Sequence, residues 1–275
     1  MRLTARRLII TPVRTWLCVL GVAVATAQPA VRAERLPLRN YRSTDGLPHD
    51  RIKSIFRDSR GFLWFCTVEG LGRFDGHHFV RYGVDDGLPS QSINDIIEAS
   101  AGVYWIASNG GGISRFDADR RTFTSLRLAE AYLSNRVNAV RLDRNGRLWA
   151  GTDAGLFWLD PQTASAVPHR EVLPAASGLG VTRLLPGSDG SLWIASVRGM
   201  TRRWPSGALR AYHLSIDGRW PVRALFEDPA GRLWIAGDRG LVVFRPGKGA
   251  PPPEGPIELA IHHTDSLAAP DPEPG

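Results

Sequence analysis

The chain has 275 residues, of which 29 are glycine and nine are tryptophan, and its formal net charge is +7. Four arginines lie in the first 27 residues, which contain no Asp or Glu, so the rest of the chain has 30 basic against 27 acidic residues. Such a small surplus argues against a surface for nucleic acid or anionic membranes, and we expect no nucleic-acid partner.

Residues 1–27 have the pattern of a secretory signal peptide. Arg2–Arg14 form a basic start, Trp16–Val24 form an apolar core, and Ala25-Thr26-Ala27 offers the small residues that a signal peptidase reads. The core is short for a membrane span, and an uncleaved N-terminal anchor is the alternative. Both interpretations predict a periplasmic or otherwise exported protein.

Cys66 is the only cysteine beyond the predicted signal peptide, so the mature chain cannot form an internal disulfide. It lies in the apolar run FLWFC, where a small buried side chain is expected. A catalytic thiol would need a partner base, and no histidine lies close to Cys66 in the sequence.

Five segments repeat one pattern, in which a glycine precedes a tryptophan by three residues and a second glycine follows it by six. The tryptophans are spaced by 41, 44, 44 and 41 residues, which is typical of propeller blades. The segments begin at Ile52, Ile93, Val137, Val181 and Val222; the tryptophans are Trp64, Trp105, Trp149, Trp193 and Trp234; the first glycines are Gly61, Gly102, Gly146, Gly190 and Gly231; the second are Gly70, Gly111, Gly155, Gly199 and Gly240.

Each repeat is predicted to consist of strands joined by tight turns. In the first repeat these strands are Ile52–Arg57, Leu63–Thr67, a third strand that ends near Phe74, and His78–Tyr82. We therefore predict an all-β protein. It is a β-propeller of five recognisable four-stranded blades, either a closed five-blade ring or a partial arc of a larger propeller.

The predicted domain organisation places a linker at 28–37, the propeller at 38–248 and a Pro-rich disordered tail at 249–275. Leu38–Arg42 precedes the same phrase as His78–Tyr82, so we expect it to supply a fourth strand to the last blade and close the ring. Ile257–Ile261 is the alternative strand. The repeats are predicted near 52–92, 93–136, 137–180, 181–221 and 222–248.

We interpret the five repeated tryptophans as packing residues, because a large aromatic side chain on the second strand suits the wedge between adjacent blades. A sugar-stacking platform is the alternative. Trp220 lies outside the period and precedes Pro221, and it is the one tryptophan that we consider a contact residue.

At these residues the chain resembles the two-component regulator propeller repeat, which joins Asp-x-x-Gly, a tryptophan in apolar surroundings, Gly-Leu and an aromatic–Asp ending. The matching segments include DSRGFLWFCTVEGLGRFD from Asp58 and DRNGRLWAGTDAGLFWLD from Asp143. The inter-blade phrase DGLP occurs at Asp45 and at Asp86. The resemblance covers about residues 38–245.

The resemblance implies a periplasmic sensor propeller like those of hybrid histidine kinases and diguanylate cyclases. No kinase or cyclase motif occurs in the sequence, so we expect a truncated relative, a gene fragment or a free-standing exported propeller. The expected function is recognition of a small molecule or saccharide in two-component-type signalling, with a membrane sensor protein as a further partner.

The turns between second and third strands share the expected ligand face, by analogy with other propellers. Because Asn and Asp before Gly are ordinary turn formers, turn geometry is the alternative explanation for these residues. We expect no cofactor and no metal, since adjacent histidines on a strand point to opposite faces. The candidate ligand-binding residues are Glu69, Asn109, Asp153, Arg198, Asp238 and Arg239.

Two other functions stay open: a free-standing exported propeller that docks another protein, and a propeller glycosidase or lyase. A carboxylate-driven hydrolase needs acidic residues at the starts of the first strands, where only Asp50 and Asp95 are acidic. We therefore expect a protein that is not an enzyme and has no catalytic residues.

Export predicts a mature N-terminus at Gln28, because Ala27 ends the motif of small residues. Mass spectrometry of the intact exported protein measures this start directly. A cytoplasmic product that retains Met1 would contradict export.

Overall fold

The computed structural model describes residues 38–161, 167–213, 221–238, 240–246 and 257–258. The described residues from Tyr41 onward belong to one compact unit. The predicted signal peptide, the linker at 28–37, most of the tail, Trp220 and Arg239 lie outside the described residues. In the described ranges the helices are 3-10 turns of three or four residues, and none could cross a membrane.

The strands form five sheets, and the strands of each sheet are consecutive in the sequence except for the short β20 (Ile257–Glu258), which joins the fourth sheet. Blade 1 contains β1 (Ile52–Arg57), β2 (Leu63–Thr67), β3 (Gly70–Phe74) and β4 (Phe79–Tyr82); blade 2 contains β5 (Ile93–Ser100), β6 (Val103–Ser108), β7 (Gly112–Asp117) and β8 (Thr122–Leu126); blade 3 contains β9 (Val137–Leu142), β10 (Leu148–Thr152), β11 (Gly155–Leu159) and β12 (His169–Glu171); blade 4 contains β13 (Val181–Pro186), β14 (Leu192–Ser196), β15 (Met200–Arg203) and β16 (Leu209–His213); blade 5 contains β17 (Val222–Glu227), β18 (Leu233–Gly237) and β19 (Gly240–Phe244). Four short helical turns join them: η1 (Ser43–Asp45), η2 (Val84–Asp86), η3 (Tyr132–Asn135) and η4 (Ala175–Ser177).

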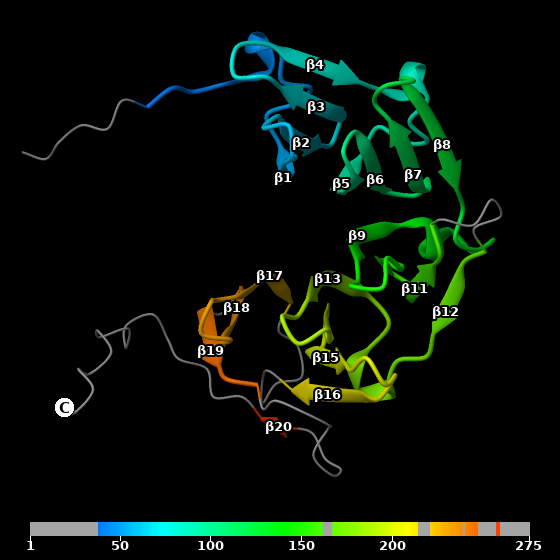
Figure 1. The fold of residues 1–275 in the computed structure, drawn as a ribbon, viewed down its shortest axis with the longest axis vertical. Helices are drawn as coiled ribbons and strands as arrows, with labels where there is room; N and C mark the ends of the chain where they lie inside the picture. The colour runs from blue at the N-terminus through cyan, green and yellow to red at the C-terminus, as the bar shows by residue number, and fades with distance from the viewer. Residues whose placement is uncertain (1–37, 162–166, 214–220, 239, 247–256, 259–275) are drawn as a thin grey trace, which may run out of the picture. The chain divides into compact units, whose positions relative to one another are not determined.

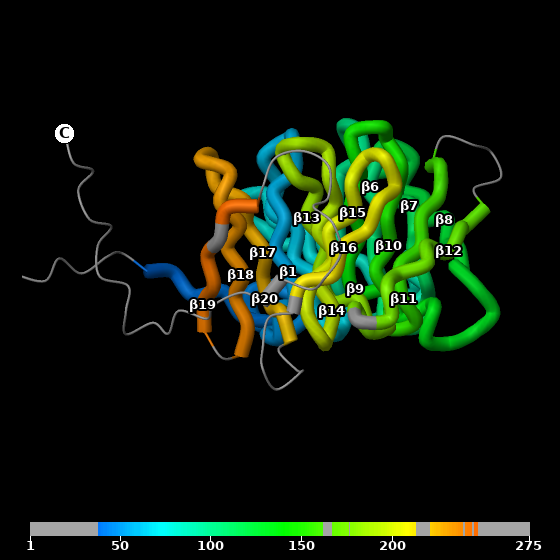
Figure 2. The backbone as a smooth tube through the Cα atoms, turned by 90° about the horizontal axis from the view of Figure 1, so that it is seen from below, coloured from blue at the N-terminus to red at the C-terminus, as the bar shows by residue number. Residues whose placement is uncertain are grey.

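The five sheets are arranged as the blades of a β-propeller, which confirms the predicted fold. The first strand of each blade contacts the first strand of the next, from β1 through β5, β9 and β13 to β17. These strands lie innermost, and the fourth strands of the first four blades lie at the outside (Figure 1). Figure 2 shows the same sheets from the side, with their turns gathered at two opposite faces.

Blade 5 differs from the prediction, because its described part has three strands and not four. Leu38–Arg42 was expected to complete it, but these residues lie outside every strand. The Tyr41 ring packs instead on Phe74 and Phe79 of blade 1, with ring centroids 4.9 and 5.8 Å away. The alternative strand is also wrong, since β20 (Ile257–Glu258) pairs in parallel with β16 of blade 4.

Adjacent blades bury an apolar core between them, and the repeated tryptophan lies at its centre. Trp64 of β2 packs with Ile93 and Ile96, the first and fourth residues of the next first strand. Trp149 of β10 packs in the same way with Val181 and Leu184. Trp105 and Trp193 make the equivalent contacts with blades 3 and 5. These four tryptophans are at most 6% exposed, so the packing interpretation is confirmed for them.

An aspartate in the turn after the first strand fixes the tryptophan in three of the blades. The Trp64 Nε1 donates to Asp58 Oδ2 at 2.8 Å, and Trp149 and Trp234 donate to Asp143 and Asp228 at 2.9 Å. Burial opposes ionisation of Asp58, but hydrogen bonds from Trp64, Tyr104 and two backbone amides outweigh it and lower the pKa. Blades 2 and 4 have Ala99 and Gly187 at this position.

The DGLP phrase precedes blades 1 and 2, and it packs the segment that leads into each of them. Asp45 Oδ2 accepts the amide of Arg42 at 2.8 Å, and Gly46 takes a φ of +108°, a backbone region that favours glycine. Leu47 and its equivalent in the second phrase, Leu88, are at most 2% exposed. The phrase is therefore a structural device for packing a connection.

The two end blades expose residues that the inner blades bury. Ile55, the fourth residue of β1, is 57% exposed, whereas the equivalent Ile96, Val140 and Leu184 are at most 2% exposed. At the other end Trp234 is only half-buried, because no blade follows it in the described part of the chain. The presence or absence of a neighbouring blade thus explains which of these equivalent side chains are buried and which are exposed.

Replacing a buried repeat tryptophan should destabilise the protein more than replacing the terminal one. Trp149→Ala removes a side chain that fills the blade wedge and should cost about 3–5 kcal/mol. Trp234→Ala should cost less than half as much, because this ring already contacts solvent. Urea unfolding of both variants beside the parent chain measures the difference, and equal losses would contradict the packing of these rings.

Candidate functional site

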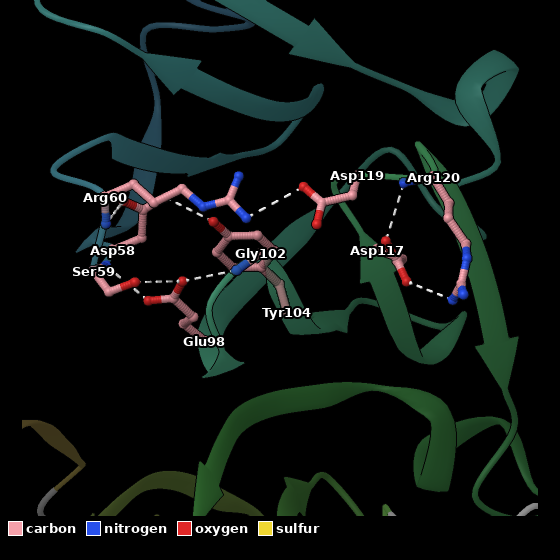
Figure 3. Close-up of polar contacts among 9 residues, drawn as sticks. All are labelled: Asp58, Ser59, Arg60, Glu98, Gly102, Tyr104, Asp117, Asp119 and Arg120. Atoms are coloured by element: carbon pink, nitrogen blue, oxygen red, sulfur yellow. Dashed lines mark hydrogen bonds and ion pairs between the residues drawn. The ribbon is translucent and has the colours of Figure 1, made fainter.

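On the face that carries the turns between first and second strands, side chains join neighbouring blades. Ser59 donates through its amide to Glu98 Oε2 at 2.7 Å and through its hydroxyl to Oε1 at 2.9 Å, and the Tyr104 hydroxyl donates to Asp58 at 2.7 Å (Figure 3). Ser188 donates in the same way to Glu227 across blades 4 and 5. These side chains join neighbouring blades.

A β-bulge recurs at the second residue of every first strand, where the pairing register shifts. The bulged residues are Lys53, Asn94, Asn138, Thr182 and Arg223. Each of the first four donates to the first strand region of the next blade: Lys53 Nζ to Asn94 Oδ1 at 2.7 Å, Asn94 Nδ2 to Val137 O at 2.6 Å, Asn138 Nδ2 to Val181 O at 2.9 Å, and Thr182 Oγ1 to Val222 O at 3.2 Å. The innermost strands are therefore linked by side chains as well as by apolar packing.

Charged groups near the inner strands are largely paired. Asp95, which is 6% exposed, accepts the amide of Val140 at 3.1 Å and Arg141 Nη1 at 2.5 Å. Burial and the charge of Arg51 lower the pKa of Lys53, and burial lowers the pKa of Arg183. Asp95 thus serves as a counterion for Arg141 and as a hydrogen-bond acceptor for the backbone of blade 3. Both roles are structural and differ from that of a catalytic acid.

Two of the predicted ligand residues meet at one arginine that the sequence analysis did not select. Arg136 Nε donates to Asn109 Oδ1 at 3.0 Å and lies 3.1 Å from Asp153 Oδ2. Asp153 Oδ1 also accepts Asn138 Nδ2 at 2.8 Å. Arg136 follows η3, so the connection between blades 2 and 3 brings it to both turns. No spacing rule in the repeat could have identified this meeting point.

The remaining predicted residues do not gather at one place. Asp238 receives two hydrogen bonds from Arg223, at 2.7 and 3.0 Å, and these bonds lower the pKa of Asp238. Glu69 is exposed, and its amide donates to Thr67 Oγ1 at 3.1 Å as part of the turn. Arg239 lies outside the described residues.

Arg198 lies at a groove of about 1030 Å³ between blades 3 and 4. The groove follows the connection between β12 and β13 and extends to the turns after β10 and β14. Its exposed apolar side chains include Val172, Leu179 and Val197, which are 82%, 66% and 42% exposed. The groove adds Arg170 to the residues that sequence reasoning had selected. Its sequence signal is the connection VLPAASGLG at 172–180, which is made of small and apolar residues.

The described residues hold no cluster of three His, Cys, Asp or Glu side chains that could bind a metal ion. Cys66 is fully buried, and burial raises the pKa of its thiol well above the usual value. It occupies the position taken by Ala107, Gly151 and Ala195 in the next three blades, where a small side chain fits the core.

Four segments of the chain match the two component regulator propeller family, at residues 46–69, 87–110, 131–154 and 216–239. Each match runs from the inter-blade connection to the turn between second and third strands. The repeat that begins at Val181 is not among the matched segments. No curated protein shows a significant sequence match.

Solved structures share the propeller fold. The extracellular domain of the hybrid two component system BT3049 from B. thetaiotaomicron is 24% identical, with a TM-score of 0.65, over 75% of this chain and 30% of that chain. The extracellular domain of BT4673 from the same organism is 25% identical, with a TM-score of 0.61, over 71% and 29%. Virginiamycin B lyase from Staphylococcus aureus is 18% identical, with a TM-score of 0.56, over 69% and 64%.

The chain thus spans about 30% of the length of the two extracellular domains that it resembles. The likeness to the lyase concerns the fold alone, because propellers with unrelated activities share this architecture. The two extracellular domains share the propeller fold with this protein, which also carries the family's repeat.

Asn138→Ala should weaken the joint between blades 3 and 4. It removes the hydrogen bonds to Val181 O and Asp153 Oδ1 and leaves a partly buried carbonyl without its donor, a loss of about 1–3 kcal/mol. Asn145→Ala is the matched control, since Asn145 is exposed in a turn. Urea unfolding should separate the two variants, and indistinguishable midpoints would contradict a role for the bulge in joining blades.

Proposed function

We propose that this chain, four segments of which match the two component regulator propeller family, is an exported ligand-recognition propeller of two-component-type signalling. The groove beside Arg198 carries the proposal, because it is a large concave surface on the face of the second-to-third turns. The structural likeness to the extracellular domain of a hybrid two component system supports a signalling role and a location outside the cytoplasm. The Arg-rich start and short apolar core of residues 1–27 support export.

Binding without catalysis is part of the same proposal. Asp95, which is acidic and lies near the start of β5, is held by Arg141 and by the amide of Val140. A glycosidase of the usual kind needs two carboxyl groups on either side of the scissile bond. The bulged positions of the inner strands are instead Lys, Asn, Thr and Arg, and they bond to the neighbouring blade in the first four cases.

A protein-docking propeller is the second candidate, and the exposed apolar residues of the end blades favour it. Ile55 is 57% exposed and Phe226 is 58% exposed. Exposed apolar surface of this kind is typical of contact sites. In this alternative the partner is an exported protein, such as a membrane sensor, that covers one end blade.

The Tm of the full exported chain, measured with and without candidate ligands, can distinguish the two functions. A ligand at 100 times its Kd adds about 2.7 kcal/mol of stability, which raises the Tm of a domain of this size by roughly 5–10 °C. We expect such a shift with at least one member of a library of saccharides and small organic acids. Arg198→Glu should abolish it, and Arg57→Glu, which changes an exposed arginine of β1, should not.

A protein recovered by pull-down from the periplasm, with no Tm shift from any compound, would favour docking over ligand recognition. An exposed end blade then becomes the functional surface, and Ile55→Asp should prevent the recovery. Turnover of a library compound by the chain would contradict binding without catalysis.

A further inference from the structure

The groove beside Arg198 differs chemically from a sugar-binding site. Among the lining residues that the structure describes, none is aromatic, and those that can form hydrogen bonds through their side chains are Arg170, Glu171 and Arg198. A saccharide would lose many hydrogen bonds to water in such a groove, and each unsatisfied hydroxyl is costly. The lining therefore suits a ligand with an apolar body.

The groove is formed before any ligand binds, because its walls are tied to the core of blade 4. The Ser196 hydroxyl donates to Ser177 O, and the Ser177 and Thr201 hydroxyls share a hydrogen bond. All three residues are at most 2% exposed. The amide of Val197 donates to Gly180 O at 3.2 Å. A preformed site spares the ligand the entropic cost of ordering these segments.

Positive charge at the groove is not balanced by a free carboxylate among its lining residues. Glu171 accepts Arg203 Nε at 3.0 Å, and both side chains are only 16% exposed. Arg170 Nη2 donates to Ala154 O at 2.9 Å, which leaves its other donors for a ligand. The groove thus offers arginine donors to an anion.

Arg198 is the donor that is best placed to meet a ligand. It is exposed, and its guanidinium has no hydrogen bond or ion pair within the part of the chain that the structure describes. Its aliphatic stem lies against Gly178, where an added Cβ would be 3.1 Å from Arg198 Cδ. The close approach at Gly178 holds the stem while the head group stays accessible.

We propose that this groove binds a small amphipathic organic anion, with an apolar body on Leu179 and Val197 and an anionic group at Arg198. The inference rests on the proposed function and names the ligand class of its site. The volume of about 1030 Å³ is at the upper end for small-molecule pockets, which are typically about 300–1,000 Å³. A guanidinium can bind a carboxylate, sulfonate or phosphate through two parallel hydrogen bonds.

Two fluorescent probes with the same apolar body test the charge requirement. 8-Anilinonaphthalene-1-sulfonate carries the anionic group, and N-phenyl-1-naphthylamine lacks it. The full chain should bind the sulfonate about tenfold more tightly, which is the contribution of about one charge-assisted hydrogen bond. Added salt should weaken binding of the sulfonate and leave binding of the neutral probe unchanged.

Three variants locate the probe on the protein. Arg198→Gln should weaken the sulfonate about tenfold and leave the neutral probe unaffected, whereas Leu179→Asp should weaken both. Arg57→Gln is the matched control, since it removes one exposed arginine from β1. Phe226→Ser tests the exposed end blade as a competing apolar surface, and it should change neither affinity.

Equal affinity for the two probes, or loss of sulfonate binding in Phe226→Ser but not in Arg198→Gln, would overturn the assignment of an amphipathic anion to this groove. If saccharides raise the Tm while the sulfonate does not bind, the propeller is still a recognition protein and only the ligand class is wrong. If neither class binds, the ligand-recognition function fails with it.

Discussion

The fold depends on the burial of one tryptophan per blade against the first strand of the next blade. Trp64 packs on Ile93 and Ile96, and the same contact recurs at the following three joints. Each joint removes a large aromatic surface from water, which is the dominant favourable contribution to folding. Each joint is formed by two different blade faces, so each end blade has one face without a neighbour. Ile55 and Trp234 lie on these exposed faces.

The same joints decide which turns are available for binding. Contacts such as Ser59 to Glu98 join blades at the first-to-second turns, and the bulged residues link the inner strands. On the opposite face, Arg136 uses Asn109 and Asp153 to fix the turns of blades 2 and 3. Arg198 is different because it is exposed beside a groove and is held through its stem. Recognition is therefore proposed at the joint of blades 3 and 4.

Blade 4 departs most from the repeat, and the groove borders it. Gly187 replaces the aspartate that accepts the tryptophan Nε1 in blades 1, 3 and 5. Arg202 lies over Trp193 instead, 4.8 Å from the ring centroid, and pairs with Asp189. The family matches also omit this repeat. A blade that keeps its packing tryptophan can thus change its turns and connections, which is where a binding site can arise on a repeated scaffold.

The sequence by itself determined the blades, since a glycine and a tryptophan at fixed spacing record local turn geometry and the need for one buried aromatic residue per joint. It predicted Ile52–Arg57 and Leu63–Thr67 to the residue. It could not predict that Tyr41 stays on blade 1, because a short strand-like segment has several compatible partners and only packing selects among them. Likewise, their place in the turns between second and third strands selected Asn109, Asp153 and Arg198, although only the first two are usual turn formers. Only the tertiary structure showed that Arg136 contacts both Asn109 and Asp153, although it is distant from both in the sequence. It also showed that Arg198 lies at a groove built partly from the neighbouring blade.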